Sequence, residues 1–239
     1  MAIERVELPK QSRRKREYDP RFIIIHTTRG APAAGEYRAS NQYSGTINWM
    51  KQGGNNQPNA NWGPSCDILI GSKGEECFFT LNGEDFHRTR ANWSAGYGSG
   101  LTYGADEHGI SIEVAQTWLN EPVTKAALET LVKRCAYLCI TYDIKPKRIR
   151  YLSQEPGDVP NGLVGHEDTA NGKLYGKTDP GNRFPWDWFI EALTNEIRKR
   201  TVKKSKHLTR IQLIMALLKG GRVIAQNQEN GKDVYKVTL

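Results

Sequence analysis

A run of aromatic and β-branched residues, RFIII at positions 21–25, continues without a polar side chain from Phe22 until His26. Such a run is typical of a strand that is buried on both faces, and a strand of that kind needs a sheet with helices packed against both sides. Open α/β sheets bind ligands at the carboxyl ends of their strands, which is where His26 lies. The run therefore predicts an α/β fold with a chemically useful residue at the end of a central strand.

The rest of the body alternates helix and strand patterns around this run. Apolar positions three and four residues apart over 123–142 mark one face of an amphipathic helix, and a second helix is expected to open at Pro185. In GISIEVA, residues 109–115, aliphatic and other residues alternate, so Glu113 is expected to face away from the aliphatic side chains. A short helix near 41–51 and a hairpin made by CDILI and ECFFTL complete the pattern. Together these elements predict a central mixed β-sheet covered by helices.

Length and periodicity divide the chain into three parts. The 239 residues suffice for one well-buried domain with a small appendage. Residues 1–20 are polar and basic without apolar periodicity, so we expect a basic N-terminal arm. The main domain is expected over residues 21–200. Residues 201–239 are expected to form a basic C-terminal appendage, with a helix near 209–219 and a β-hairpin that turns at Asn230-Gly231.

The net charge of +8 is concentrated toward the C-terminus, where residues 198–210 carry seven Lys or Arg and no acid. A cationic segment of this kind predicts attraction to a polyanion, such as an anionic wall polymer, a membrane face or nucleic acid, although a solvated linker explains it equally well. No apolar run is long enough for a membrane span, and the N-terminus lacks the apolar region of a secretory signal peptide. We therefore expect synthesis in the cytoplasm, with the four cysteines present as reduced, packed thiols.

Three short stretches far apart in the sequence carry residues that zinc accepts as ligands. They are IIIHTT with His26, VGHEDT with His166 and KTDPGN with Asp179. Catalytic zinc sites use three protein ligands and leave the fourth position to water, and two imidazoles with one carboxylate meet that requirement. His87 and His108 compete as ligands, but both lie in charged contexts typical of solvated loops. We therefore predict that His26, His166 and Asp179 bind Zn²⁺.

Four motifs, RFIIIHTT, GISIE, GHEDT and KTDPGNRFPW, occur in an order and spacing that resembles the type 2 N-acetylmuramoyl-L-alanine amidases. That family includes phage endolysins, wall-recycling amidases and peptidoglycan recognition proteins, and the similarity covers roughly residues 21–197. The resemblance implies hydrolysis of the amide bond between N-acetylmuramic acid and the L-alanine of the stem peptide. It also implies that His26, His166 and Asp179 bind zinc, with peptidoglycan or a muropeptide as the substrate.

The resemblance further assigns catalytic roles to Glu113 and Lys177. Zinc lowers the pKa of its bound water to about 7, so hydroxide becomes available at neutral pH. Glu113 is expected to take a proton from that water and return it to the leaving amine, and Lys177 to stabilise the negative charge on the carbonyl oxygen. Without the resemblance, the same residues would be an exposed strand carboxylate and an ordinary loop lysine. Asp168 is expected either to orient His166 or to be an ordinary loop acid.

The chain also departs from the family pattern. Where many members have Tyr-His at the start of the hairpin strand, it has Cys66-Asp67, so the tyrosine-assisted form of the mechanism is not expected there. Where members often have Trp-His-Ala-Gly, Ser94 replaces the histidine, which removes a possible substrate contact. From residue type alone, we expect aromatic rings and amides to line a cleft for a glycopeptide, and the candidates are Asn61, Trp62, Trp93 and Tyr97.

Several biological roles stay open at the level of sequence. We favour a phage-type endolysin that lyses the cell wall, because a cationic tail suits anionic envelope polymers; a cytosolic recycling amidase that acts on imported muropeptides is the alternative. A non-catalytic peptidoglycan-binding module with the same fold is disfavoured by the full ligand set. The helix and hairpin expected in residues 201–239 resemble the end of a winged-helix domain, but with one helix in the segment we do not favour nucleic-acid binding.

Overall fold

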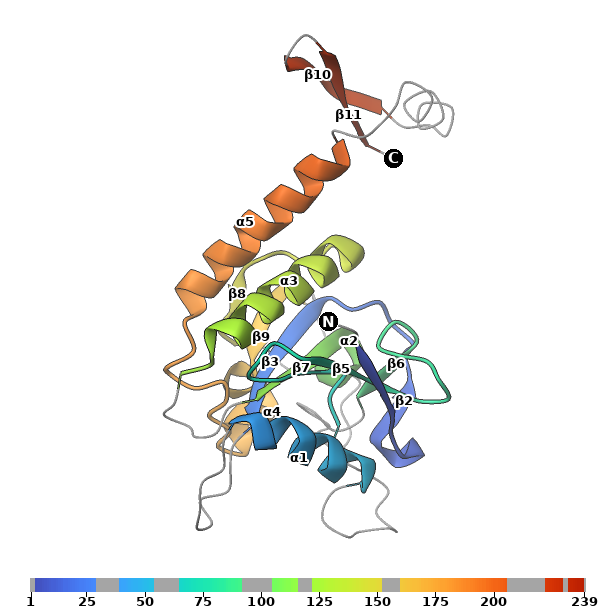
Figure 1. Cartoon of the computed structure of the whole chain (residues 1–239), viewed down its shortest axis with the longest axis vertical. Coiled ribbons are helices and arrows are strands. Elements are labelled where there is room, and N and C mark those ends of the chain that lie inside the picture. Colours follow the sequence, from blue (N-terminus) through green and yellow to red (C-terminus); the bar gives the residue numbers. More distant parts are fainter. Residues whose placement is uncertain are drawn as a thin grey trace. The chain divides into compact units, whose positions relative to one another are not determined.

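The fold is built on a seven-stranded mixed sheet (Figure 1). The computed structural model describes residues 3–28, 39–53, 65–91, 105–115, 122–151, 160–205, 222–229 and 232–238. The strands of the sheet are β1 (Glu4–Glu7), β5 (Glu76–Thr80), β4 (Ile68–Ile70), β7 (Gly109–Ala115), β3 (Phe22–Thr28), β9 (Gly162–Gly165) and β8 (Arg148–Ile149), in that spatial order. β3 runs parallel to both of its neighbours, β7 and β9, whereas β4 and β5 are antiparallel. The predicted mixed sheet is therefore confirmed.

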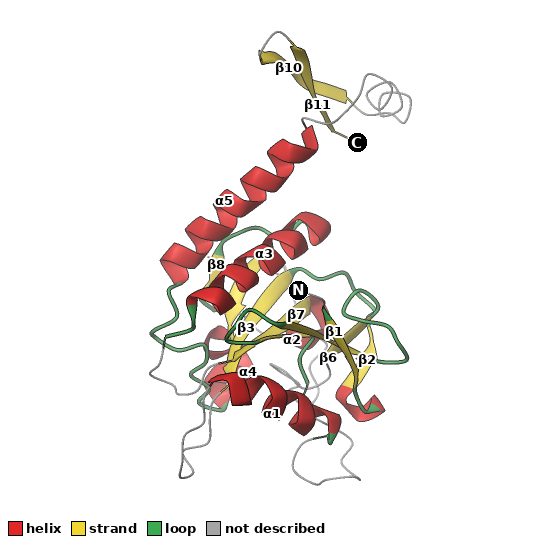
Figure 2. Ribbon diagram, viewed as in Figure 1, coloured by secondary structure: helices red, strands yellow, loops and turns green. Residues whose placement is uncertain are grey.

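Helices cover the two faces of this sheet (Figure 2). Ile47 of α1 (Ala39–Lys51) belongs to the same buried cluster as Phe79 of β5. On α3 (Lys125–Tyr142), Arg134 lies over the ring of Phe78, with its guanidinium carbon 4.6 Å from the ring centroid. Because successive strand residues face opposite sides, α1 and α3 cover opposite faces. The other helices are α2 (Ala105–His108), α4 (Ala170–Leu174), α5 (Trp186–Ser205) and the 3-10 turns η1 (Lys10–Ser12) and η2 (His166–Asp168).

Strand β3 lies inside the sheet, between β7 and β9, and is buried along its whole length. Ile23, Ile24 and Ile25 are all 0% exposed. Full burial of such a side chain contributes about 1.5–3 kcal/mol, so these three residues are a major source of stability. The interpretation of RFIII as a strand buried on both faces is confirmed.

The described N-terminal residues belong to the folded body, so the prediction of a separate basic arm over residues 1–20 is wrong for them. β1 pairs in parallel with β5, and β2 (Arg13–Lys15) pairs antiparallel with β6 (Thr89–Ala91). Arg13 is 1% exposed, and its guanidinium donates a hydrogen bond to Asp67 at 2.9 Å. The basic sequence was misleading because the acid that neutralises Arg13 lies 54 residues further along the chain.

All four cysteines are buried free thiols. Burial, with a smaller contribution from Glu4, raises the pKa of Cys77 to about 12, and burial raises the pKa of Cys139 to about 12. Burial also raises the pKa of Cys66 and Cys135. These thiols therefore stay protonated near neutral pH, and they pack as small apolar side chains.

The chain divides into two compact units, Met1–Leu193 and Thr194–Leu239. In the second unit, β10 (Arg222–Glu229) and β11 (Lys232–Thr238) are antiparallel and Glu229 lies opposite Lys232, which confirms the predicted hairpin. The helix expected near 209–219 lies outside the described residues, and the extents 21–200 and 201–239 remain predictions. Within the described ranges, no helix is both long and apolar enough to cross a membrane.

Candidate metal centre

Two parallel central strands bring His26 and Glu113 together. His26 on β3 is the register partner of Glu113 on β7, so both side chains leave the sheet on the same face. On β4, Leu69 is the register partner of Glu113, and it belongs to the buried cluster that also contains Ile47 of α1. His26 is 2% exposed, whereas the side chain of Glu113 is 21% exposed. The register therefore places a buried imidazole beside a carboxylate that water can reach.

The strand on the other side of β3 supplies the second histidine. β9 ends at Gly165, and His166 begins the turn η2. The backbone N–H of Glu167 donates to the carbonyl oxygen of Asp179 at 2.8 Å, which ties this turn to the loop that carries the aspartate. Gly172 passes directly against the carbonyl oxygen of His166, where an added Cβ would overlap that oxygen. The position of His166 is thus fixed by backbone contacts on two sides.

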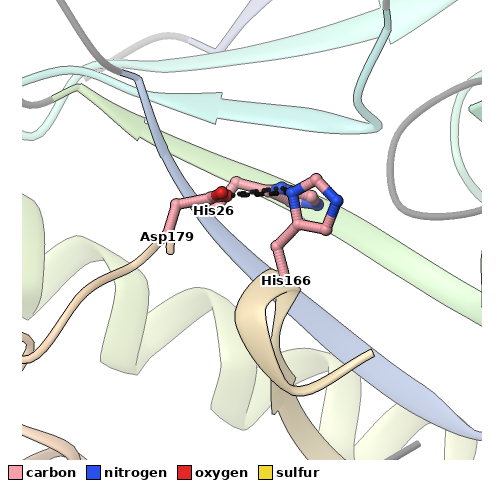
Figure 3. Close-up of side chains that lie close together, drawn as sticks. All are labelled: His26, His166 and Asp179. Carbon is pink, nitrogen blue, oxygen red and sulfur yellow. Dashed lines mark hydrogen bonds and ion pairs between the residues drawn. The ribbon is translucent and has the colours of Figure 1, made fainter. Parts of the chain in front are cut away.

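Three ligand-type atoms converge from these positions (Figure 3). Nδ1 of His26 lies 3.1 Å from Nδ1 of His166 and 3.0 Å from Oδ2 of Asp179, and the last two atoms are 3.1 Å apart. His166 is 8% exposed and Asp179 is 7% exposed. Among the described residues, these three form the group of His, Cys, Asp and Glu side chains close enough to share one ion. The structure therefore brings together the three residues predicted as ligands.

The electrostatics of the cluster favour its ligand-competent form. Burial, followed by the neighbouring His166, lowers the pKa of His26 below its ordinary value. Burial by itself would raise the pKa of Asp179, but hydrogen bonds from His166 and His26 outweigh it and hold that pKa well below the usual range. Near neutral pH the cluster therefore offers a neutral imidazole nitrogen of His26 and an anionic oxygen of Asp179 to a cation.

The donor set fits a zinc-sized ion. Zinc binds imidazole nitrogen and carboxylate oxygen at about 2.0–2.2 Å, so two ligands at neighbouring corners of a tetrahedron lie roughly 3.3 Å apart. The three separations near 3 Å in this cluster are close to that value. A buried group of two imidazoles and one carboxylate, with Glu113 beside it, can therefore hold a divalent metal.

Comparison with known proteins identifies the family. Residues 16–182 match the family model for N-acetylmuramoyl-L-alanine amidase, and this range is more than half of the chain. The chain belongs to the type 2 N-acetylmuramoyl-L-alanine amidase family. A search of curated protein sequences finds no significant match.

Three solved structures illustrate what this chain is similar to. The hydrolase AmiA of Staphylococcus aureus aligns with a TM-score of 0.54 and 16% identity, over 85% of this chain and 86% of that chain. AmpD aligns with a TM-score of 0.47 and 21% identity, over 80% and 93% of the two chains. The amidase LysC of Clostridium intestinale aligns with a TM-score of 0.47 and 15% identity, over 81% and 98%. The AmiA alignment shows that the fold is shared.

Glu113 and Lys177, the two residues predicted as catalytic, differ in how they contact the cluster of predicted ligands. Oε1 of Glu113 is 4.0 Å from Nδ1 of His26, so Glu113 borders the cluster directly. Lys177 is exposed, and its backbone N–H donates to the carbonyl oxygen of Gly172 at 2.7 Å. Its positive charge contributes, after burial and His166, to the lowered pKa of His26. Both residues are therefore near the cluster, and their catalytic roles remain predictions.

Arg148 contacts the two acidic residues that follow His166, and sequence analysis missed it. Its guanidinium donates to Oδ2 of Asp168 through Nε at 3.2 Å and Nη2 at 2.8 Å, and it stacks on Trp186 with 4.4 Å to the ring centroid. Asp168, left open between two roles, thus binds an arginine, and that arginine also contacts Glu167 at 3.5 Å. The signal in the sequence was the pair Glu167 and Asp168, which directly follows His166, because two adjacent carboxylates that are partly buried need a cationic partner.

The remaining predicted positions have separate outcomes. His87 is exposed and its Nδ1 lies 2.6 Å from the hydroxyl of Tyr142. His108 is 8% exposed, so its assignment to a solvated loop is wrong. It is buried because α2, which ends at His108, packs against β7. The proposed substrate-binding residues Asn61, Trp62, Trp93 and Tyr97, together with Ser94, lie outside the described residues.

Proposed function

We propose that this protein is a zinc-dependent N-acetylmuramoyl-L-alanine amidase that cleaves the bond between N-acetylmuramic acid and L-alanine in peptidoglycan. Family membership supports the substrate class. The observation that carries the proposal is the convergence of His26, His166 and Asp179 within about 3 Å of one another. A complete set of two imidazoles and one carboxylate favours hydrolysis over a binding module that has lost its metal.

The side chains around the cluster have distinct tasks in this proposal. His26, His166 and Asp179 would hold the ion, which supplies Lewis acidity and lowers the pKa of water in its open position. Glu113 accepts a proton from the attacking water, and returns it to the nitrogen of L-alanine as the amide bond breaks. Lys177 stabilises the negative charge that develops on the carbonyl oxygen. The products are the free lactyl carboxylate and a stem peptide with a free amine.

Two measurements test the enzyme proposal. Metal content should approach one zinc per chain, and the loaded protein should release soluble stem peptides from purified sacculi, with release abolished by a chelator and restored by zinc. Binding to sacculi without release at saturating zinc would instead identify a non-catalytic peptidoglycan-binding module.

We further propose that the protein acts as a phage-type endolysin, on the wall after release from the cytoplasm. The support is the cationic segment at residues 198–210, since an anionic wall polymer is a suitable partner for it. An endolysin should prefer whole sacculi, whereas a recycling amidase should prefer small anhydro-muropeptides. Salt-sensitive binding of the full chain to duplex DNA but not to sacculi would argue for a nucleic-acid partner instead.

A further inference from the structure

The segment between His166 and Asp179 is held by hydrogen bonds near both of these predicted ligands. The hydroxyl of Thr169 donates to the carbonyl oxygen of His166 at 2.9 Å, and the backbone N–H of Thr169 donates to the same oxygen at 3.1 Å. At the other end, the carbonyl oxygen of Asp179 accepts from the backbone N–H of Glu167 at 2.8 Å. The backbone of each ligand is therefore tied to another part of the same segment.

Thr169 joins the carbonyl group of His166 to the short helix α4. Its backbone is extended, and it follows η2 and directly precedes the first residue of α4. Its side-chain oxygen accepts a hydrogen bond from the backbone N–H of Gly172 at 2.9 Å, as a threonine at the start of a helix typically does. One hydroxyl thus holds the ligand as a donor and the helix as an acceptor.

The position of Thr169 makes these two hydrogen bonds hard to replace. Thr169 is 1% exposed, so water has little access to its hydroxyl. Valine has nearly the same shape but no hydroxyl, and it would leave the buried N–H of Gly172 without this acceptor. A buried polar group that loses its partner costs free energy, and the backbone can recover that energy only by moving. Such a movement would shift the carbonyl group of His166 as well.

Gly172 extends the contacts from His166 to Lys177. An added Cβ at Gly172 would overlap the carbonyl oxygen of His166 and would lie 2.8 Å from Oγ1 of Thr169. The carbonyl oxygen of Gly172 accepts from the backbone N–H of Lys177 at 2.7 Å. The contacts therefore run from the ligand through Thr169 and Gly172 to the lysine.

We propose that Thr169 is a positioning residue for the metal centre. Its hydroxyl fixes the backbone of His166 and, through Gly172, the place of Lys177 relative to that ligand. Loss of a group that holds a metal ligand in place typically lowers metal affinity by about 10–100-fold. The proposal rests on the proposed function, because it takes His166 as a zinc ligand and Lys177 as the group that stabilises charge in the transition state.

The first test is the zinc affinity of the apoprotein, measured on the full chain by competition with a chromogenic chelator. Thr169→Val should weaken that affinity about tenfold, because both hydrogen bonds of the hydroxyl are lost. Thr169→Ser keeps the hydroxyl, so it should bind zinc within about twofold of the unmodified chain. Circular dichroism establishes that each variant is folded.

Thr124 provides the matched control. It precedes the first residue of α3, its Oγ1 accepts from the backbone N–H of Ala127 at 3.3 Å, and its hydroxyl donates to the carbonyl oxygen of Ser72. The hydroxyl therefore makes the same two kinds of hydrogen bond as that of Thr169, with partners that are not in the metal centre. Thr124→Val should lower stability and leave zinc affinity unchanged.

A second pair of variants tests the same contact without changing the hydroxyl. Gly172→Ala should also weaken zinc binding about tenfold or more, because the new Cβ displaces the carbonyl group of His166. Gly45→Ala on α1 is its control, since a Cβ at that position meets no atom within 4 Å. This pair decides the importance of the contact even if Thr169→Val does not fold.

Kinetics at saturating zinc test the connection to Lys177. Thr169→Val should lower kcat for stem-peptide release about fivefold and leave KM unchanged, because the lysine acts on charge that develops only in the transition state. Thr169→Ser should restore kcat. An unchanged kcat in Thr169→Val would overturn the part of the proposal that concerns Lys177.

Unchanged zinc affinity in folded Thr169→Val, or equal losses in Thr169→Val and Thr169→Ser, would overturn the proposal while the hydrolytic function stands. An equal loss in Thr124→Val would also overturn it, since the effect would then follow general stability. If the unmodified chain binds zinc but releases no stem peptide, the proposed reaction fails, and the zinc affinities still decide the role of Thr169. If the unmodified chain binds no zinc, both proposals fail.

Discussion

Replacing Asp67 by alanine should destabilise the fold strongly, because this carboxylate neutralises a buried arginine. It accepts hydrogen bonds from the guanidinium of Arg13 at 2.9 Å and from the backbone N–H groups of Ala91 at 3.1 Å and Ser111 at 2.9 Å. The side chains of Arg13 and Asp67 are 0% and 1% exposed. Removing one partner of a buried pair costs about 3–5 kcal/mol, and each buried N–H group left without an acceptor adds about 1–3 kcal/mol.

Other hydrogen bonds of Arg13 reduce the loss of stability expected from these contributions. Its guanidinium also donates to the carbonyl oxygen of Cys66 at 2.8 Å and to the hydroxyl of Thr89 at 2.9 Å. We therefore expect Asp67→Ala to lower the free energy of unfolding by about 4 kcal/mol, a large share of the roughly 5–15 kcal/mol typical of a domain.

Urea unfolding, followed by tryptophan fluorescence in the presence of a chelator, measures this effect without a contribution from metal binding. With a slope of about 2–3 kcal/mol per molar urea, the midpoint should fall by roughly 1.3–2 M. Glu129→Ala is the matched control. Its partner Lys125 is 3.9 Å away and the two side chains are 51% and 89% exposed, so the change should stay within about 0.5 kcal/mol.

A loss of less than about 1 kcal/mol in Asp67→Ala would refute the reasoning, because a buried guanidinium would then tolerate the absence of its counter-ion. The double variant Arg13→Met/Asp67→Leu provides a second check. It leaves no buried charge unpaired, so it should be more stable than the sum of the two single effects predicts.

Three other predictions concern the metal centre and its surroundings. Asp179→Ala should weaken zinc binding by more than about 100-fold in a competition titration with a chromogenic chelator, since one of three ligands is lost; unchanged affinity would remove Asp179 from the site. Glu113→Gln should keep its metal and lower kcat by about 10²–10⁴-fold, because an amide cannot take up the proton; wild-type turnover would exclude Glu113 as the base. Burial, followed by the charges of Arg21, Arg16 and Arg90, lowers the pKa of His108, so the unfolded chain binds a proton more readily than the folded chain does. The stability that neutral His108 contributes is present above its unfolded pKa of about 6.5 and is lost as the pH falls below that value. His108→Gln should therefore flatten the decline of the urea midpoint between pH 7 and pH 5. An unchanged decline would show that His108 does not contribute to the pH dependence of stability.

Sequence patterns predicted the elements that depend on local order. The run at 21–25 and the alternation at 109–115 correspond to observed strands, and the hairpin predicted near the C-terminus is observed as the antiparallel pair β10 and β11. The pairing of Arg13 with Asp67 could not be predicted in this way. A basic residue near the N-terminus has the same local signature whether it is solvated or buried, and the difference lies in a partner 54 residues away. Arg148 was missed for the same reason, since its partner Asp168 lies 20 residues further along the chain.

The order of strands explains why ligands so distant in sequence meet at one point. β3 lies between β7 and β9 and runs parallel to both, so the three carboxyl ends share one edge of the sheet. His26, Glu113 and His166 lie at or next to those three ends, although 140 residues separate the two histidines. The same arrangement explains Asp67. At a position where many family members have a histidine, this chain has a carboxylate that is already bound by Arg13 and by the backbone N–H of Ser111 on β7. Both oxygens of Asp67 therefore accept hydrogen bonds, and the one from Ser111 ties this carboxylate to the strand that carries Glu113.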